Sequence, residues 1–266
     1  MSELYIIPDR SCIEESMQLA DKYGAHFEYN DFFSPSILDD EEEVKKLIAF
    51  YSGLNRDRSK DMLHGAFLDV TIHSEDEKIR SVSELRVRQS IEIGVRLGVR
   101  GVIFHTNIIP NFKTQSYMKH WVNSNECFWR RMLALYPDIE ILVENMFDEE
   151  PDLLAELAER MADEPRFGVC FDYAHALVFG EEQEIENWVK KLLPHTHHMH
   201  INDNDLKVDL HQAVGEGAVD WFEFTGFMQN GKTDCSVLIE MRGTEKQRAS
   251  FEYMKQKAIY PFHILK

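Results

Sequence analysis

The sequence predicts a closed barrel of eight β/α units, formed as a single domain over residues 1–266. Short apolar runs rich in β-branched and aromatic residues occur eight times, at roughly thirty-residue spacing, and longer amphipathic segments separate them. Strands that alternate with helices are typical of βαβ units and a parallel sheet. No linker divides the chain, and such barrels commonly use about 250 residues as one unit. A doubly wound open sheet is the alternative that the same alternation allows.

The predicted strands are apolar along most of their length, as a parallel sheet buried on both faces requires. They cover residues 4–7, 26–29, 62–67, 101–105, 139–144, 167–172, 196–200 and 236–240.

Three of the intervening segments carry helix signals. Residues 39–53 begin with five acidic residues, which suit a helix N-terminus because its free N–H groups favour negative charge. A further helix begins near Pro151, since proline is favoured in a first turn. Residues 79–99 end at Gly98, a common helix exit. They place six apolar residues at helical spacing, namely Ile79, Val82, Leu85, Ile91, Val95 and Leu97.

The composition excludes several classes of protein. A net charge of −18 favours solubility and disfavours a polyanionic partner. No apolar run approaches the ~20 residues that span a membrane, and we expect no signal peptide. The four cysteines show no CxxC spacing, so we expect reduced thiols and a cytoplasmic location. The sequence predicts no particular oligomeric state.

Candidate metal ligands follow six successive predicted strands, from the third to the eighth. In a barrel of this kind the carboxyl ends of the strands form the active site. Each residue alone has a structural explanation, as a packed histidine or a helix cap. Together they would crowd carboxylates at one buried mouth, which costs several kcal/mol each unless a cation compensates them. They are His64, His105, Glu144, Asp172, His175, His200, Asp209, His211 and Glu240.

Mixed imidazole and carboxylate ligands suit Zn, Mn, Co or Fe better than Ca or Mg. Nine ligands exceed what one ion takes, so we expect one to three ions. Glu28, at the end of the second strand, either orients a ligand from behind or forms a surface salt bridge. Strand alternation places His198 on the same face as His200 and turns His197 toward the helices, and we assign both His197 and His198 to structure.

Three segments carry a resemblance to a known family. They are 166–176 (RFGVCFDYAHA), 199–203 (MHIND) and 209–217 (DLHQAVGEG). They resemble the xylose-isomerase-like barrel superfamily, which unites sugar and sugar-phosphate isomerases and epimerases with apurinic-site nucleases of the endonuclease IV type. The resemblance covers nearly the whole chain and implies that all nine residues match the three-zinc site of the nucleases. For the isomerases and epimerases it implies one ion held by Glu144, Asp172, His200 and Glu240, with Glu144 and Glu240 also exchanging protons with the substrate.

The resemblance leaves two functions open. In a metal-dependent sugar or sugar-phosphate isomerase or epimerase, the ion polarises a carbonyl, one of Glu144 and Glu240 removes a proton and the other returns one. His175 and His211 then ligate a second ion or bind sugar hydroxyls, and a hydride shift is the alternative to proton transfer. In an apurinic-site nuclease, clustered ions activate water for phosphodiester hydrolysis. A non-catalytic binding protein is a third possibility, which the paired glutamates disfavour.

The loops after the strands favour the sugar enzyme. A nuclease holds backbone phosphates mostly through Lys, Arg and backbone N–H groups. Here the loops at 30–33, 73–77, 147–150 and 180–182 carry acidic residues, and residues 202–208 hold only Lys207 as a cation. We therefore expect a small sugar or sugar phosphate from carbohydrate metabolism as substrate, rather than DNA. A phosphate group would find Arg242, Lys207 and Lys113 near the mouth, although these cations could equally pair with the acidic loops.

Overall fold

The computed structural model describes residues 2–180, 185–231 and 235–262. Eight parallel strands follow one another in chain order around a closed barrel, and the last strand pairs with the first. The predicted fold class is therefore confirmed. The strands are β1 (Leu4–Ile6), β2 (Ala25–Tyr29), β3 (Met62–His64), β4 (Gly101–His105), β5 (Glu140–Glu144), β6 (Phe167–Asp172), β7 (Thr196–Ile201) and β8 (Ser236–Ile239).

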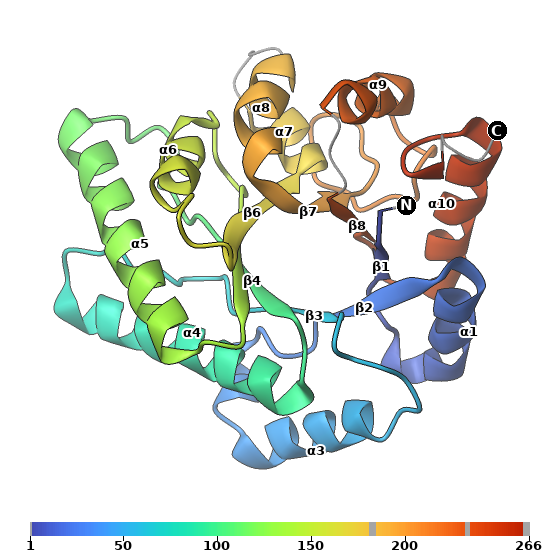
Figure 1. Ribbon diagram of the computed structural model, residues 1–266, viewed down its shortest axis with the longest axis horizontal. Coiled ribbons are helices and arrows are strands. Elements are labelled where there is room, and N and C mark those ends of the chain that lie inside the picture. Colours follow the sequence, from blue (N-terminus) through green and yellow to red (C-terminus); the bar gives the residue numbers. More distant parts are fainter. Residues whose placement is uncertain (1, 181–184, 232–234, 263–266) are drawn as a thin grey trace.

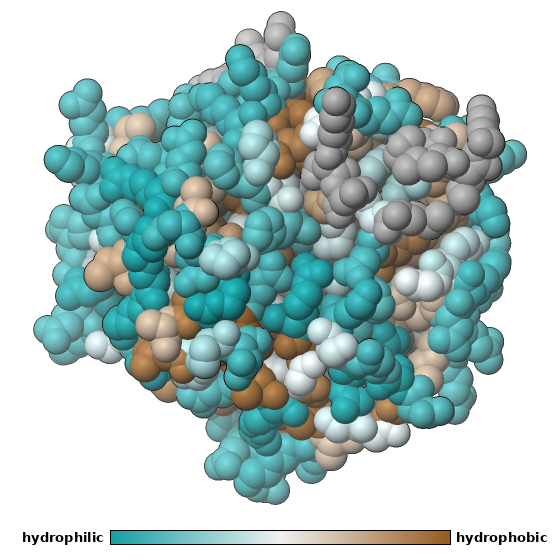
Figure 2. Space-filling view, in the orientation of Figure 1, coloured by the Kyte–Doolittle hydropathy of each residue, from teal (hydrophilic) through white to brown (hydrophobic). Residues whose placement is uncertain are grey.

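Helices surround the ring of strands (Figure 1). Within the described residues they are α1 (Ile13–Tyr23), α2 (Pro35–Leu38), α3 (Glu41–Ser52), α4 (Glu77–Leu97), α5 (Gln115–Leu135), α6 (Asp152–Arg160), α7 (Tyr173–Phe179), α8 (Ile185–Leu192), α9 (Trp221–Gly231) and α10 (Thr244–Lys257), with short 3-10 turns at Arg10–Cys12 and Leu193–His195. None of them is long and apolar enough to cross a membrane. The face seen in Figure 2 is mostly hydrophilic, with smaller hydrophobic areas between.

The inside of the barrel has an apolar layer and, above it, a polar one. The apolar layer consists of Tyr5, Ile7, Met62, Ile103, Leu142, Cys170 and Leu238. Alternate residues of a strand point to the same side. Two positions after Met62, Ile103, Leu142, Cys170 and Leu238, the inward residue is therefore a metal-ligand type: His64, His105, Glu144, Asp172 and Glu240. The polar layer thus lies at the carboxyl end of the barrel, and we call the seven residues of the apolar layer the apolar floor.

Helix α4 buries a different face from the one that its apolar residues predict. Ile79, Val82, Leu85 and Val95 are 47 to 55% exposed, whereas Ser83 and Ser90 are buried together with Val87 and other apolar residues. The two serine hydroxyls accept hydrogen bonds from the backbone N–H groups of Thr71 and Ala66, at 2.8 and 3.0 Å. Small serines let the helix approach the loop after β3 and satisfy its backbone, which counting apolar residues alone does not reveal.

The ends of these helices lie close to the predicted ones. Asp40 caps α3 by accepting from the N–H groups of Glu42 and Glu43. Helix α6 follows Pro151 directly. Gly98 ends α4 with φ of +73°, a left-handed conformation that favours glycine.

Candidate metal centre

The nine predicted residues converge at the carboxyl end of the barrel. Five end or directly follow a strand, because β3, β4, β5 and β6 end in His64, His105, Glu144 and Asp172, and Glu240 follows β8. His200 is the penultimate residue of β7, His175 lies in α7, and Asp209 and His211 lie in the loop after β7. Three groups made of these residues alone have ligand atoms close enough to hold an ion: His64, His105 and Glu144; Glu144, Asp172, His175 and Glu240; and His175, Asp209 and His211. The ninth residue, His200, belongs to two further groups, one with Glu144 and Cys170 and one with Glu28 and His198.

Glu144 is the centre of the arrangement. Its Oε2 lies 3.2 Å from Nε2 of His105, 3.5 Å from Nε2 of His64 and 3.3 Å from Nδ1 of His200. Its Oε1 lies 3.4 Å from Nδ1 of His175. The predicted core set thus comes together around Glu144, with Nδ1 of His200 also 3.6 Å from Oε1 of Glu240.

A separate group lies toward the loop after β7. Oδ2 of Asp209 is 3.4 Å from Nε2 of His175 and 2.9 Å from Nε2 of His211. His211 adopts a backbone φ of +47°, which is uncommon for residues other than glycine. The loop holds it there because Nδ1 of His211 donates to the backbone carbonyl of Glu240, at 2.7 Å.

Three histidines of the centre are each held through one ring nitrogen. Nδ1–H donates to a backbone carbonyl in His64, His175 and His211, namely that of Gly65, Asn145 and Glu240. The Nε2 atom of each then faces a carboxylate, that of Glu144 for His64 and that of Asp209 for the other two. Metal-binding histidines almost always donate their other N–H in this way.

The spacing of the ligand atoms fits a small ion. Two nitrogens on one tetrahedral zinc ion lie about 3.3 Å apart, because each Zn–N bond is about 2.0 Å. The Nε2 atoms of His64 and His105 are 3.2 Å apart, and both are 3.2 to 3.5 Å from the Glu144 carboxylate. The donor set and the spacing therefore fit a divalent ion.

The carboxylates of the centre lack hydrogen-bond donors. Buried oxygens without a partner include both of Glu144, Oδ2 of Asp172, Oδ1 of Asp209 and Oε2 of Glu240. Burial raises the pKa of Asp172 well above its ordinary value, and the charges of Glu240 and Glu144 raise it further against the opposing His175. Burial opposes the charge of His175 too, but Asp172, Asp209 and Glu144 raise the pKa of its imidazole well above the ordinary value. Positive charge is therefore favoured at this site.

Asp203 builds the loop that carries Asp209 and His211. Its buried carboxylate accepts from the N–H groups of Gly215 and Val219 and from the indole of Trp221, at 2.8 to 3.1 Å. A Cβ atom at Gly217 would lie 2.3 Å from Oδ1 of Asp203, so only glycine fits there.

Sequence reasoning left one feature of the site open and missed another. Glu28 is fully buried and contacts both His198 and His200, so of its two predicted roles the surface salt bridge is wrong. Asn145, directly after Glu144, bonds both backbone groups of Asp172 through its side chain, at 2.9 and 3.0 Å. A polar residue that follows a strand-ending ligand was the available signal. His197 lies where the pairing of β6 and β7 shifts register, and it contacts Glu140 at 2.7 Å.

Comparisons with known proteins complete the description. The family model of the xylose isomerase-like TIM barrel matches residues 17–257. The uncharacterised protein MJ1311 of Methanocaldococcus jannaschii is 24% identical over 203 residues, which are 73% of this chain and 69% of that protein.

Three solved structures have the same fold. The TTHB071 protein of Thermus thermophilus, soaked with ZnCl2, has a TM-score of 0.73 at 23% identity, over 97% of this chain and 98% of that one. A D-tagatose 3-epimerase-like protein has a TM-score of 0.73 at 21% identity, over 97% of both chains. Endonuclease IV of Thermus thermophilus has a TM-score of 0.61 at 16% identity, over 96% and 98%.

Proposed function

The chain belongs to the xylose isomerase-like TIM barrel family, and from this membership and the geometry of its site we propose that it is a metal-dependent sugar isomerase or epimerase. The observation that carries the proposal is the pair of buried glutamates, Glu144 and Glu240, which flank Nδ1 of His200 at 3.3 and 3.6 Å. Both glutamates have carboxylate oxygens without a hydrogen-bond partner. They can therefore bind an ion and also accept a proton from a substrate.

The nine residues of the centre are the proposed ligands of one to three divalent ions, with zinc, manganese or cobalt best suited to the donors. A bound ion would hold adjacent oxygens of the sugar and polarise its carbonyl, which acidifies the neighbouring C–H. One of Glu144 and Glu240 removes that proton, and the other returns a proton to the adjacent carbon or the opposite face. His175 and His211, on the side of Asp209, would bind further sugar hydroxyls or a second ion.

The charges around the mouth support a small sugar as substrate. Lys113 is engaged by Glu149 and Glu150, at 3.4 and 3.1 Å, and Arg10 by Asp31 at 3.1 Å. Among the described residues, Arg242 and Lys207 make no ion pair with a carboxylate. Glu181 and Glu182, two of the predicted acidic loop residues, lie outside the described residues. A neutral or singly phosphorylated sugar suits this mouth better than a polyanion. The D-tagatose 3-epimerase-like neighbour supports the same substrate class.

A second candidate is phosphodiester hydrolysis at abasic DNA. The arrangement of all nine ligands in groups that share Glu144 or His175 favours it, because an isomerase needs only the core set. The endonuclease IV neighbour is consistent with it. Metal-loaded protein should bind abasic duplex weakly even at low salt, where phosphate contacts are strongest. Efficient metal-dependent nicking of that duplex at ordinary salt would reverse the order of the two candidates.

Solvent exchange tests the isomerase. Metal-loaded protein is incubated with ketoses and aldoses, with and without phosphate, in deuterated water, and deuterium beside the carbonyl is measured by NMR. Glu240→Gln should lower turnover by about 100-fold or more, because it removes general acid–base help. The comparison is made at saturating metal, since the same carboxylate is a proposed ligand.

Glu245→Gln, at an exposed position in the first turn of α10, is the control and should keep full turnover. Turnover without exchange would replace the two glutamate bases with a hydride shift. No turnover and no exchange across the sugars would refute the isomerase.

A further inference from the structure

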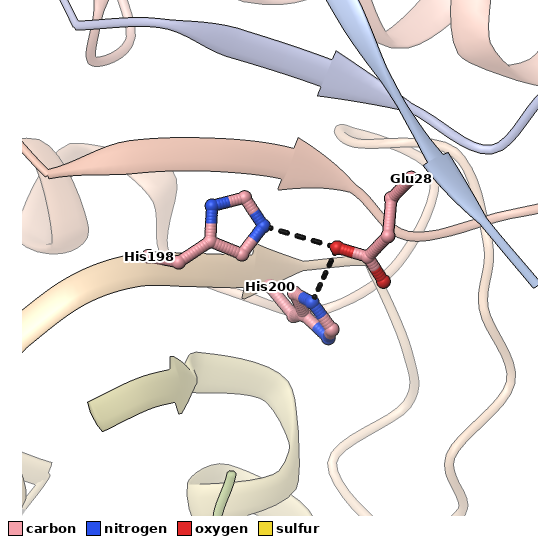
Figure 3. Close-up of side chains that lie close together, drawn as sticks. All are labelled: Glu28, His198 and His200. Carbon is pink, nitrogen blue, oxygen red and sulfur yellow. Dashed lines mark hydrogen bonds and ion pairs between the residues drawn. The ribbon is translucent and has the colours of Figure 1, made fainter. Parts of the chain in front are cut away.

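Glu28 joins two histidines below the candidate metal centre (Figure 3). Its Oε2 lies 3.2 Å from Nε2 of His198 and 3.2 Å from Nε2 of His200, and all three side chains are fully buried. Glu28 comes from β2 and the two histidines from β7, on other sides of the barrel. The contacts therefore cross its interior.

The proton positions in this group follow from its partners. Nδ1 of His198 lies 2.6 Å from the hydroxyl of Ser236, and that hydroxyl donates to the backbone carbonyl of His197 at 3.2 Å. The Glu28 carboxylate can only accept a hydrogen bond, so an imidazole that bonds to it must donate. His200 therefore donates Nε2–H to Glu28. Its Nδ1 is left with a lone pair, and that atom is buried without a hydrogen-bond partner beside Glu144 and Glu240.

Glu28 also differs from a carboxylate that only stabilises the fold. Asp61 is equally buried and has Arg56 at 2.6 Å as a cationic partner. Among the described residues, Glu28 has only the two histidines within ion-pair distance, and its Oε1 has no hydrogen-bond partner. Burying a carboxylate without a cation costs several kcal/mol. A cation on the far side of His200 would offset that cost.

We propose that Glu28, which also contacts His198, is a positioning residue that fixes the tautomer and orientation of His200, so that Nδ1 of His200 is the metal-binding atom. This inference rests on the metal-binding part of the proposed function. It does not depend on the substrate. Carboxylates behind a histidine ligand also raise its basicity, and their loss typically weakens metal binding 10- to 100-fold.

Metal affinity tests the proposal directly. Apo protein is titrated with Co2+ and Zn2+ against a chromophoric chelator, with no sugar present. Glu28→Leu removes both acceptor and charge, so its Kd should rise about 10- to 100-fold. Glu28→Gln keeps an acceptor oxygen and loses the charge, so its Kd should rise by less. The visible absorption of bound Co2+ should change in both variants, because the histidine ligand is reoriented or less basic.

The matched control is Glu140→Gln, which breaks a glutamate–histidine contact at the other end of the barrel and should leave Kd and spectrum unchanged. Urea unfolding of each apo variant measures the fold separately. A lower urea midpoint with unchanged Kd and spectrum would assign Glu28 to stability alone and overturn the proposal. If Glu28→Leu does not fold, unchanged Kd and spectrum in Glu28→Gln overturn it. Wild-type protein that binds neither ion would refute both this proposal and the metal-dependent function, whereas failure of the sugar assays alone leaves it intact.

Discussion

Carboxylates contact histidines at both ends of the barrel, but the two ends differ in how the carboxylate charge is neutralised. At the amino end, Glu140 accepts from His197 at 2.7 Å and from Arg100 at 2.8 Å, and Arg100 also pairs with Glu3. At the carboxyl end, Glu144 faces four imidazoles, and its oxygens have no hydrogen-bond donor. Charges of the amino end are neutralised within the chain. Under the proposed function, those of the carboxyl end are completed by a metal ion, so that one cluster stabilises the fold and the other binds.

The largest effect should come from Asp172→Asn at the carboxyl end. Asn can still cap α7, where Asp172 accepts from the N–H of His175 at 2.6 Å, but it loses the charged ligand. Metal affinity should fall by more than the ~100-fold typical of residues behind a ligand. Because the pKa of Asp172 is raised by burial and by neighbouring carboxylates, the apo variant should unfold at the same urea concentration as wild type or a higher one. Unchanged metal affinity in Asp172→Asn would contradict the proposal that the carboxylates of the carboxyl end bind a metal ion.

A buried histidine without a carboxylate partner extends the comparison of the two ends to the pH dependence of stability. His73, in the loop after β3, is buried, and burial followed by the charge of His120 lowers its pKa to about 4. The unfolded chain therefore binds a proton first as the pH falls. Stability is complete above about pH 6.5 and decreases by about 3 kcal/mol toward pH 4, at about 1.4 kcal/mol per unit. Urea unfolding of apo protein at pH 7, 5.5 and 4 should show a smaller decrease in His73→Gln. Parallel curves for the two proteins would exclude this role.

The smallest effect should follow from Glu140→Gln at the amino end. The variant loses the charge that Arg100 and His197 share, which should lower the free energy of unfolding by about 2 kcal/mol, as for hydrogen bonds to charged groups. Metal affinity should stay the same, because the contact lies below the apolar floor. Chemical denaturation and chelator competition on one preparation measure both quantities. A loss of metal affinity here would mean that the two ends are coupled.

Sequence periodicity was sufficient for the barrel and for the convergence of the nine candidate residues at its carboxyl end. All eight strands alternate with helices, and the ligands recur where strands end, so each could be placed from its own neighbourhood. The buried face of α4 could not be predicted in this way, because it depends on hydrogen bonds from a loop to Ser83 and Ser90 rather than on apolar residues. The contact of Glu28 with His198 and His200 joins residues 170 and 172 positions apart, and it depends on how strands align across the barrel. Periodicity gives the inward direction of a side chain but not its partner.

The apolar floor has a consequence for how ligands reach the candidate metal centre. Ile103, Leu142 and Leu238 are fully buried beneath the ligands, and their side chains offer neither water nor an ion a polar partner on the amino side. A metal ion and a substrate would both enter past the loops at the carboxyl end, and the metal ion would have to bind first because its ligands lie deeper. A metal ion seated on the ligands would be covered by the substrate above it. The substrate would then leave before the metal ion can, so metal exchange should slow when a sugar occupies the mouth.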